Sequence, residues 1–307
     1  MGKCCVSGAG AINVDYKART VEIDGIVLKE GDFISINGTT GEVYNGKVET
    51  KAAEVSGDFA DLMALCEKHT KLVVRTNADT PHDAKVARDF GAVGIGLCRT
   101  EHMFFEAEKI VAMREMILAQ DAEGRKKALA KLLPYQQKDF YGIFKAMDGC
   151  PVNVRLLDPP LHEFVPHDLK GQEEMAKAMG VTVEYIRQRV DSLCEANPML
   201  GHRGCRLGNT YPEITEMQTR AILGAAIQLK KEGGDPHPEI MVPLTGILYE
   251  FEAQEKVIRA TAAELFAEEG IEIPFKVGTM IEIPRAALTA NRIASRAEYF
   301  SFGTNDL

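Results

Sequence analysis

Arginines recur where the chain leaves predicted β-strands, and two carboxylates follow the last two of these strands. The arginines are Arg75, Arg99, Arg155, Arg203 and Arg206, and the carboxylates are Glu282 and Asp306, the latter preceded by Asn305. A guanidinium fork matches phosphate and carboxylate groups. Carboxylates beside such an anion need a cation between them, and Mg²⁺ takes one or two protein carboxylates and completes its octahedron with water and substrate oxygens. The pattern predicts a metal-assisted site for a phosphorylated or carboxylate substrate.

Each of these residues also has a simpler explanation. A lone arginine is usually part of a surface ion pair, and the repeated strand-end placement favours a site most for Arg99 and Arg155. It leaves the roles of the other three arginines open. Glu282 is also explained as an acid near a helix start, and Asp306 as an ordinary turn residue.

The elements that position these residues alternate between strand and helix from residue 71 onward. Strands are expected at 72–74, 92–97, 152–157, 204–207, 240–244, 275–283 and 299–302, and helices at 107–119, 183–196, 213–231, 248–268 and 286–297. Buried strands alternating with helices indicate a parallel sheet. Seven such strands fit an α/β fold, a (β/α)8 TIM-type barrel lacking its last unit, in which residues after the strands converge on one mouth. The segments 103–149 and 162–200 are predicted additions at that mouth.

Residues 1–50 differ from the rest of the chain. Short β-type runs alternate there with Asn-Gly and Asp-Gly turns, which predicts a small β-rich unit with too little apolar material to stand alone. A hydrophilic, helix-prone linker is expected at 51–70, and the barrel at 71–307. The chain stops a few residues after its last predicted strand, which suggests a chain cut in mid-fold.

Composition excludes several classes of protein. The 307 residues are 45% hydrophobic, and 36 basic against 45 acidic side chains give a net charge of −9. These values exclude disordered, collagen-like and disulfide-framework proteins, and the charge argues against a non-specific nucleic-acid binder. No apolar run is long enough to span a membrane, and seven scattered cysteines indicate free thiols in a reducing compartment. We expect a soluble, cytoplasmic protein, with an organelle left open.

Several strings closely resemble sequences of the pyruvate, phosphate dikinase family of phosphoenolpyruvate-utilising enzymes. They lie at 96–104 (GLCRTEHMF), 154–164 (VRLLDPPLHEF), 201–207 (GHRGCRL), 278–285 (GTMIEIPR) and 302–307 (FGTNDL). The opening MGKCCVSG looks like the stretch just after that family's phosphohistidine motif, so the likeness covers essentially the whole chain. Phosphoenolpyruvate synthase and enzyme I of the sugar phosphotransferase system share the glutamate and Asn-Asp strings. The string at 154–164 favours the dikinase over both.

The resemblance implies a role for each matching position. In this family an ATP-grasp domain phosphorylates a histidine on a swivelling domain, which carries the phosphoryl group to a barrel that binds pyruvate or phosphoenolpyruvate. By this likeness, Arg99 and Arg155 hold the phosphoryl group and substrate oxygens, Glu282 and Asp306 ligate Mg²⁺, and Gly303, Thr304 and Asn305 contact the substrate.

Other parts of the family pattern are missing from the sequence. The phosphohistidine would lie before Met1, the acid/base cysteine beyond Leu307, and the nucleotide domain is absent. The expectation is therefore a fragment, inactive alone, of an enzyme that converts ATP, phosphate and pyruvate into AMP, pyrophosphate and phosphoenolpyruvate. The swivelling and ATP-grasp domains would be its partners, and the intact enzyme a homodimer.

Two other functions compete with this interpretation. A Mg²⁺-dependent carbon–carbon lyase of the citrate-lyase type resembles the same superfamily in its metal carboxylates and arginine, but it has no swivelling domain to explain residues 1–50. A stand-alone module that senses phosphoenolpyruvate would expose a strand edge, which favours aggregation. Both are therefore weaker than the dikinase interpretation.

Overall fold

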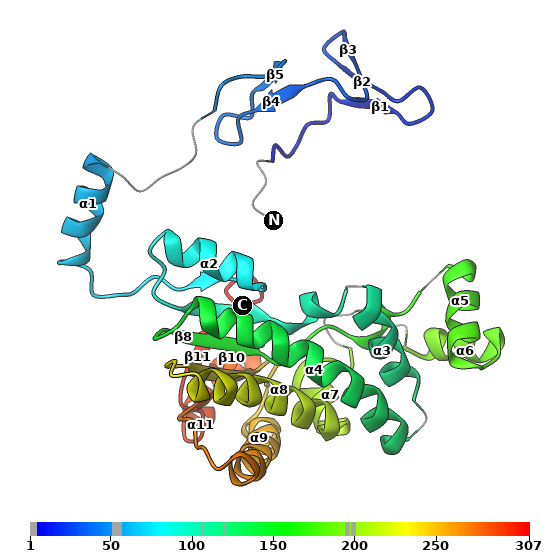
Figure 1. The fold of residues 1–307 in the computed structure, drawn as a ribbon. Coiled ribbons are helices and arrows are strands. Elements are labelled where there is room, and N and C mark those ends of the chain that lie inside the picture. Colours follow the sequence, from blue (N-terminus) through cyan, green and yellow to red (C-terminus); the bar gives the residue numbers. More distant parts are fainter. Residues whose placement is uncertain are drawn as a thin grey trace. The chain divides into compact units, whose positions relative to one another are not determined.

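The computed structural model describes residues 5–50, 57–105, 107–119, 121–166, 168–193, 197 and 201–307. The chain divides into two units, residues 1–64 and 65–307, and α1 (Asp58–Glu67) crosses the division (Figure 1). The predicted boundaries at 50 and 70 lie on either side of this division and stay predictions. Parts of the opening string, the linker and the helix predicted at 183–196 lie outside the described residues.

The first unit consists of short antiparallel strands, as predicted. β1 (Asn13–Asp15), β2 (Thr20–Ile23) and β3 (Ile26–Lys29) form one sheet, and β4 (Ile34–Ile36) pairs with β5 (Val43–Asn45). β2 turns into β3 at Asp24 and Gly25, whose φ angles of 49° and 79° are the positive values that a tight hairpin needs. None of residues 5–50 and 57–64 is buried. This agrees with the expectation that the segment has too few apolar residues for a core.

The second unit is built on a six-stranded parallel sheet with the order β11-β10-β9-β8-β7-β6. The strands are β6 (Thr76–Asn77), β7 (Ile95–Arg99), β8 (Pro151–Arg155), β9 (His237–Val242), β10 (Lys276–Ile281) and β11 (Phe300–Phe302). Neighbouring strands follow chain order and are joined through helices, which is the arrangement of a TIM-type barrel. The mixed α/β class and the partial TIM-type barrel are thus confirmed.

Two of the predicted barrel strands are wrong. Leu72, Val73 and Val74 are 82%, 70% and 73% exposed, and the ladder begins only at Thr76, because an apolar run does not fix which residues enter a sheet. Residues 204–207 begin a helix, α7 (Gly204–Thr210), since a short apolar run suits either element. The short β6 takes the place of the strand predicted at 72–74 and no strand replaces the one predicted at 204–207, so the described sheet has six strands where seven were predicted.

Helices cover the sheet in the same order as its strands. α2 (Pro81–Asp89) packs on α4 (Ala122–Ala146), α4 on α8 (Pro212–Lys231), and α8 on α9 (Leu248–Glu269), which also contacts α11 (Ala290–Ile293). A short α10 (Pro284–Leu288) precedes α11. Thr80 caps α2, because its side-chain oxygen accepts the N–H of Asp83. The main core lies between these helices and the strands, with Phe140, Phe144 and Phe251 among its fully buried side chains.

A second core lies among the segments that join β7 to β8 and β8 to β9. It includes residues of η1 (Thr100–Phe104), α3 (Ala107–Leu118), η2 (Leu161–Phe164), α5 (Leu169–Met179) and α6 (Val183–Leu193). The amino-terminal half of α4 contributes Leu129 and Leu132 to this core, whereas its carboxyl-terminal half contributes Phe140 and Phe144 to the main core. The segment predicted as an addition, 103–149, is therefore too long, because it includes α4, whose carboxyl-terminal half packs in the barrel layer.

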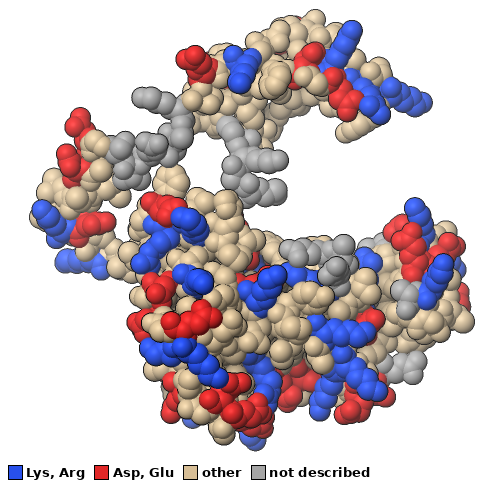
Figure 2. Space-filling model, in the orientation of Figure 1, with Lys and Arg blue, Asp and Glu red and all other residues tan. Residues whose placement is uncertain are grey.

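Charged side chains of both signs are interspersed on the face of the second unit that Figure 2 shows. On the face shown in Figure 2, acidic and basic side chains alternate over its helices without a continuous patch of one sign. The net charge of −9 is therefore an average that says little about any one site. None of the helices in the described ranges combines the length and the apolar composition that crossing a membrane requires.

The burial of the cysteines predicts which thiols react in the folded chain. Cys98 and Cys205 are buried, and burial raises the pKa of Cys205 to about 12 and that of Cys98 well above its ordinary value, whereas Cys5 and Cys66 are exposed. Because the thiolate is the nucleophile, we expect iodoacetamide at pH 8 to modify Cys5 and Cys66 in the native chain. Cys98 and Cys205 should react only after unfolding, as read by peptide mass spectrometry. Labelling of either thiol in the native chain would contradict its burial.

Candidate active site

The two arginines that the sequence favoured most lie side by side at the carboxyl ends of neighbouring strands. Arg99 is the last residue of β7 and Arg155 the last of β8, and they are direct partners in the parallel ladder. Glu282 follows β10, and Asp306 follows β11 after a short turn. The sheet therefore brings these four predicted residues to one edge, as expected for a barrel mouth.

Arg155 is clamped between two buried carboxylates. Its Nη2 donates to Glu101 Oε1 at 2.5 Å, and its Nη1 lies 3.1 Å from Asp158 Oδ2. The Asp158 and Glu101 side chains are only 2% and 7% exposed. Burial opposes the charged form of Arg155, but Glu101, Asp158 and Glu282 outweigh it and raise the pKa of the guanidinium. Arg155 is therefore a fixed cation rather than a mobile surface charge.

Arg203 joins this cluster through Asp158. Its Nη2 lies 2.6 Å from Asp158 Oδ2, and its Nε donates to Asp158 Oδ1 at 3.3 Å. The next residue, Gly204, has a φ of 56° and donates its N–H to the Asp158 carbonyl at 3.0 Å. A Cβ at Gly204 would lie 2.7 Å from Leu244 Cβ and 3.2 Å from Asp158 Oδ1, so only glycine fits. The start of α7 is thus fastened to the end of β8.

Arg99 is held by a second aspartate. Asp79, which follows β6, accepts the backbone N–H of Arg99 at 2.7 Å, and its other oxygen lies 2.7 Å from His102 Nδ1 and 3.9 Å from Arg99 Nη1. The Arg99 side chain is 35% exposed, so its guanidinium stays accessible. Arg99 is therefore held by an aspartate that follows the neighbouring strand, whereas the aspartate that holds Arg155 follows Arg155's own strand.

Gln218 of α8 forms hydrogen bonds to the segments that follow both β7 and β8. Its side-chain amide donates to Thr100 Oγ1 at 3.0 Å and accepts the N–H of Leu157 at 2.8 Å. All of these polar groups are buried, where a hydrogen bond left unmade is costly. The residue after Arg99 and the second residue after Arg155 therefore share one support.

Glu282 is buried next to charges of its own sign. Its Oε1 accepts the N–H of Leu244 at 2.6 Å, and Leu244 has a φ of 60°, a strained value for a non-glycine residue. Burial and the charges of Asp158 and Asp306 raise the pKa of Glu282, against the opposite effect of Leu244 N–H and Arg155. A buried carboxylate repelled by two others is a group that a bound cation would stabilise.

Gly303 lets the two predicted metal carboxylates approach each other. A Cβ there would lie 2.7 Å from Glu282 Cβ and 3.0 Å from Asp306 Oδ2. Its N–H donates to the Ile281 carbonyl at 2.9 Å and its carbonyl accepts the N–H of Asp306 at 2.9 Å, so both groups are already engaged within the protein. Thr304 and Asn305 are exposed in the turn between them, and their substrate roles stay predictions.

The donor set fits a Mg²⁺ ion that needs its substrate to complete the site. In the described part of the chain, no three His, Cys, Asp or Glu side chains form a ready metal cluster. Glu282 and Asp306 supply the one or two carboxylates that Mg²⁺ takes from protein, and water or substrate oxygens would supply the rest. The charged residues placed at this mouth are five carboxylates (Asp79, Glu101, Asp158, Glu282 and Asp306) and three arginines (Arg99, Arg155 and Arg203). Their net charge of two negatives disfavours an anion that comes without a cation.

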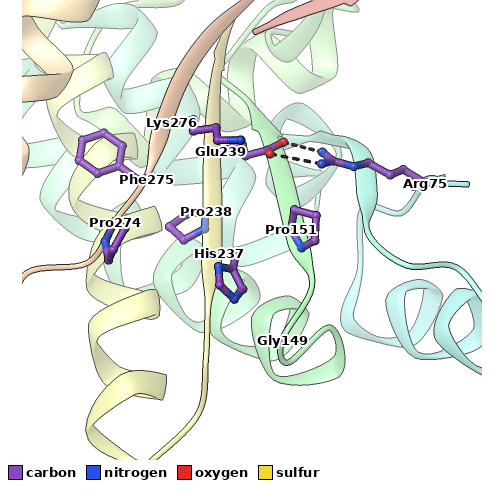
Figure 3. Close-up of a pocket in the computed structure, with 9 residues that line it drawn as sticks. All are labelled: Arg75, Gly149, Pro151, His237, Pro238, Glu239, Pro274, Phe275 and Lys276. Atoms are coloured by element: carbon purple, nitrogen blue, oxygen red, sulfur yellow. Dashed lines mark hydrogen bonds and ion pairs between the residues drawn. The ribbon is translucent and has the colours of Figure 1, made fainter. Parts of the chain in front are cut away.

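Arg75 lies at the opposite end of the sheet, which corrects its predicted place at the mouth. It precedes β6, and its Nη1 donates at 2.6 Å to Glu239 Oε2, near the start of β9. Both residues line a cavity of about 400 Å³, together with Pro151 and Lys276, the first residues of β8 and β10. Figure 3 shows the Arg75–Glu239 pair among the lining side chains. The error follows from the misplaced strand at 72–74, since a residue before the ladder lies at its amino end.

Arg206 also lies apart from the cluster. It is on α7, and its Nη1 donates to the Gly201 carbonyl at 3.0 Å, within its own loop. Of the three arginines left open, only Arg203 therefore joins the cluster.

Sequence reasoning missed the carboxylates that hold the arginines. Asp79, Glu101 and Asp158 all follow strand ends, but none of them was among the predicted site residues. The available signal was the repeated pattern of an arginine at a strand end with an acid two or three residues later, as in Arg99 with Glu101 and Arg155 with Asp158. That pattern shows an acid is near, although it does not show which arginine it binds.

Comparisons with known proteins agree with this geometry. Residues 53–307 match the family model described as "PEP-utilising enzyme, PEP-binding domain". Proteins named pyruvate, phosphate dikinase from Giardia intestinalis and Clostridium symbiosum are 56% and 54% identical over the whole chain, which covers 35% of each. One from Flaveria pringlei, named chloroplastic, is 54% identical, and the chain covers 32% of it. The chain thus spans about a third of the length of these curated relatives.

Proposed function

Because the chain belongs to the PEP-utilising enzymes, we propose that its second unit forms the pyruvate- and phosphoenolpyruvate-binding half-site of a pyruvate, phosphate dikinase. The single observation that carries the proposal is the placement of Arg99 and Arg155 on adjacent strand ends at the same edge as Glu282 and Asp306. Arginines recognise the phosphoryl and carboxylate groups of phosphoenolpyruvate, and paired carboxylates recognise the cation that accompanies them.

The residues of the site divide the work between positioning and charge. Arg155, held by Glu101 and Asp158, presents its remaining N–H donors in a fixed direction, and the more exposed Arg99 can adjust to the incoming phosphoryl group. Glu282 and Asp306 would hold Mg²⁺, which when bound stabilises the negative charge on the enolate oxygen. Phosphoryl transfer depends mainly on such positioning and charge neutralisation. The turn of Gly303, Thr304 and Asn305 would orient the substrate.

The whole enzyme requires parts that complement this half-site. We propose a swivelling domain with a phosphohistidine and an ATP-grasp domain that charges it, so that ATP, phosphate and pyruvate yield AMP, pyrophosphate and phosphoenolpyruvate. A homodimer and a cytoplasmic or organellar location remain predictions. The chain alone is expected to bind the three-carbon substrate without forming phosphoenolpyruvate from ATP, and AMP formation coupled to phosphoenolpyruvate by the purified chain would contradict this.

Binding of phosphoenolpyruvate to the purified chain should depend on a divalent cation. The mouth is negative without one, so we expect calorimetry to show affinity at least about tenfold weaker when EDTA replaces Mg²⁺. Asp306→Asn should reproduce the effect of EDTA while Mg²⁺ is present. Glu239→Gln, at the other end of the sheet, should leave the affinity unchanged. Equal affinity with and without Mg²⁺ would refute the proposed site.

A further inference from the structure

Asp158 is the residue on which the arginine cluster converges. A single oxygen, Oδ2, lies 3.1 Å from Arg155 Nη1 and 2.6 Å from Arg203 Nη2, and Oδ1 accepts from Arg203 Nε at 3.3 Å. The side chain is 2% exposed, so water has little access to replace it. Two guanidinium groups are therefore held at one buried carboxylate, without which their like charges would face each other.

The orientation of Arg155 is determined by contacts on both of its terminal nitrogens. Glu101 engages Nη2 and Asp158 engages Nη1, and a planar guanidinium fixed at two nitrogens has no freedom to rotate within the site. The remaining N–H donors must then point in one direction. Glu101 alone would leave the Nη1 edge free to turn toward other acceptors.

Asp158 is also connected to the carboxylate side of the mouth. Its charge contributes to the raised pKa of Glu282, as does that of Asp306. Its carbonyl accepts the N–H of Gly204, so a movement of Asp158 would move the start of α7 as well. One residue therefore has contacts with both arginines, with α7 and, electrostatically, with the proposed cation ligand.

We propose that Asp158 is a positioning residue that holds Arg155 and Arg203 as one preorganised cationic unit for the phosphoryl or carboxylate oxygens of the substrate. Both of its oxygens are occupied by arginine, so it acts through them rather than by touching the substrate. This inference rests on the proposed function, because it assigns the unit to the phosphoenolpyruvate site. The inference adds two residues to the site. The role of Arg203 was left open by the sequence, and Asp158 was not among the predicted site residues.

The test compares two isosteric substitutions of buried, arginine-bound carboxylates in the 307-residue chain. Asp158→Asn removes the charge shared by Arg155 and Arg203, and Glu239→Gln removes the partner of Arg75 at the amino end of the same sheet. Calorimetry with phosphoenolpyruvate and Mg²⁺ measures the affinity of each variant, and thermal unfolding measures its stability. We expect Asp158→Asn to weaken binding about 10–100-fold, as loss of an orienting outer partner does, and Glu239→Gln to bind like the wild type.

Two outcomes would overturn the inference. Affinity of Asp158→Asn within twofold of the wild type would show that the arginines need no positioning by Asp158. An equal loss in Glu239→Gln would show that any buried ion pair has the same effect, hence a general structural role. If the wild-type chain itself fails to bind phosphoenolpyruvate with Mg²⁺, the proposed function fails first.

A second measurement needs no variant at position 158 that folds. Nitrogen-15 NMR of the arginine Nη groups reports rotation about the Cζ–Nη bonds. In the ligand-free wild type, we expect separate, slowly exchanging Nη signals for Arg155 and Arg203, assigned by their loss in Arg155→Lys and Arg203→Lys. Averaged signals that become separate only when phosphoenolpyruvate is added would overturn the preorganised unit, whether or not the ligand binds as proposed.

Discussion

Replacing Arg155 by alanine is expected to remove phosphoenolpyruvate binding and also to destabilise the second unit. The substitution leaves Glu101 without its ion-pair partner and Asp158 with Arg203 alone, and both carboxylates are buried. Breaking a buried ion pair by removing one partner costs about 3–5 kcal/mol. In a unit of this size that corresponds to a fall in Tm of roughly 6–20 °C. Urea or thermal unfolding followed by circular dichroism measures this loss.

Arg99→Ala is the matched control, because the two arginines share the site but not the burial. Arg99 is 35% exposed and its nearest carboxylate oxygen is 3.9 Å away, so its loss should change stability by less than about 1 kcal/mol. Its effect on phosphoenolpyruvate binding should nevertheless be large. Equal destabilisation by the two alanine substitutions would contradict the clamp around Arg155.

In the complete enzyme that we propose, Arg155→Ala should separate the two half-reactions. Phosphoenolpyruvate formation should fall by about 10²–10³-fold or more, as when an electrostatic contact to the transition state is removed. The exchange between ATP and the phosphohistidine should survive, since under the proposed function it takes place on other domains. Isotope exchange measures each half-reaction by itself, and an equal loss of both would argue against the assignment of Arg155 to the three-carbon site.

The residues of the mouth could be predicted where the strand itself was predicted well. Arg99, Arg155 and Glu282 lie at or directly after strands whose buried, apolar sequences place their carboxyl ends to within about two residues. The TIM-type layering followed from the alternation of strands and helices. The prediction for Arg75 was wrong for the opposite reason. The apolar run before it, residues 72–74, is exposed and precedes the paired residues, so it does not indicate at which end of the sheet Arg75 lies.

The partners of these arginines could not be predicted from local sequence. Asp158 and Arg203 are 45 residues apart, and Arg155 and Glu101 are 54 apart. Their pairing depends on which strands are neighbours and on a glycine-dependent turn into α7 that was mistaken for a strand. A side chain such as Asp158, followed by two prolines, has the local features of a turn. Only the packed structure distinguishes a turn residue from a buried carboxylate that binds two arginines.

Replacing Glu282 by glutamine should make the metal-free chain more stable while it removes cation-dependent binding. Glutamine keeps an oxygen for the N–H of Leu244 but removes a buried charge that Asp158 and Asp306 repel. Relieving such a functional group commonly gains about 0.5–2 kcal/mol. Mg²⁺ should raise the Tm of the wild type, through binding to the native state, and have no effect on Glu282→Gln.

The pH dependence of this gain follows from the direction of the pKa shift. Burial raises the pKa of Glu282 in the folded chain, so the unfolded chain releases its proton first as pH rises. At about pH 4 the group is largely protonated in the folded state, and the wild type and Glu282→Gln should differ little. Above the raised pKa the wild type carries the full penalty of the ionised group, so the advantage of glutamine should grow as pH rises through that pKa and level off above it. Tm values of the two chains in EDTA between pH 4 and 8 test this, and a Glu282→Gln chain that is less stable at pH 7.5 would show that Arg155 and Leu244 already compensate the charge. In that case the site would need no cation for its own stability, and the case for Glu282 as a metal ligand would lose its physical support.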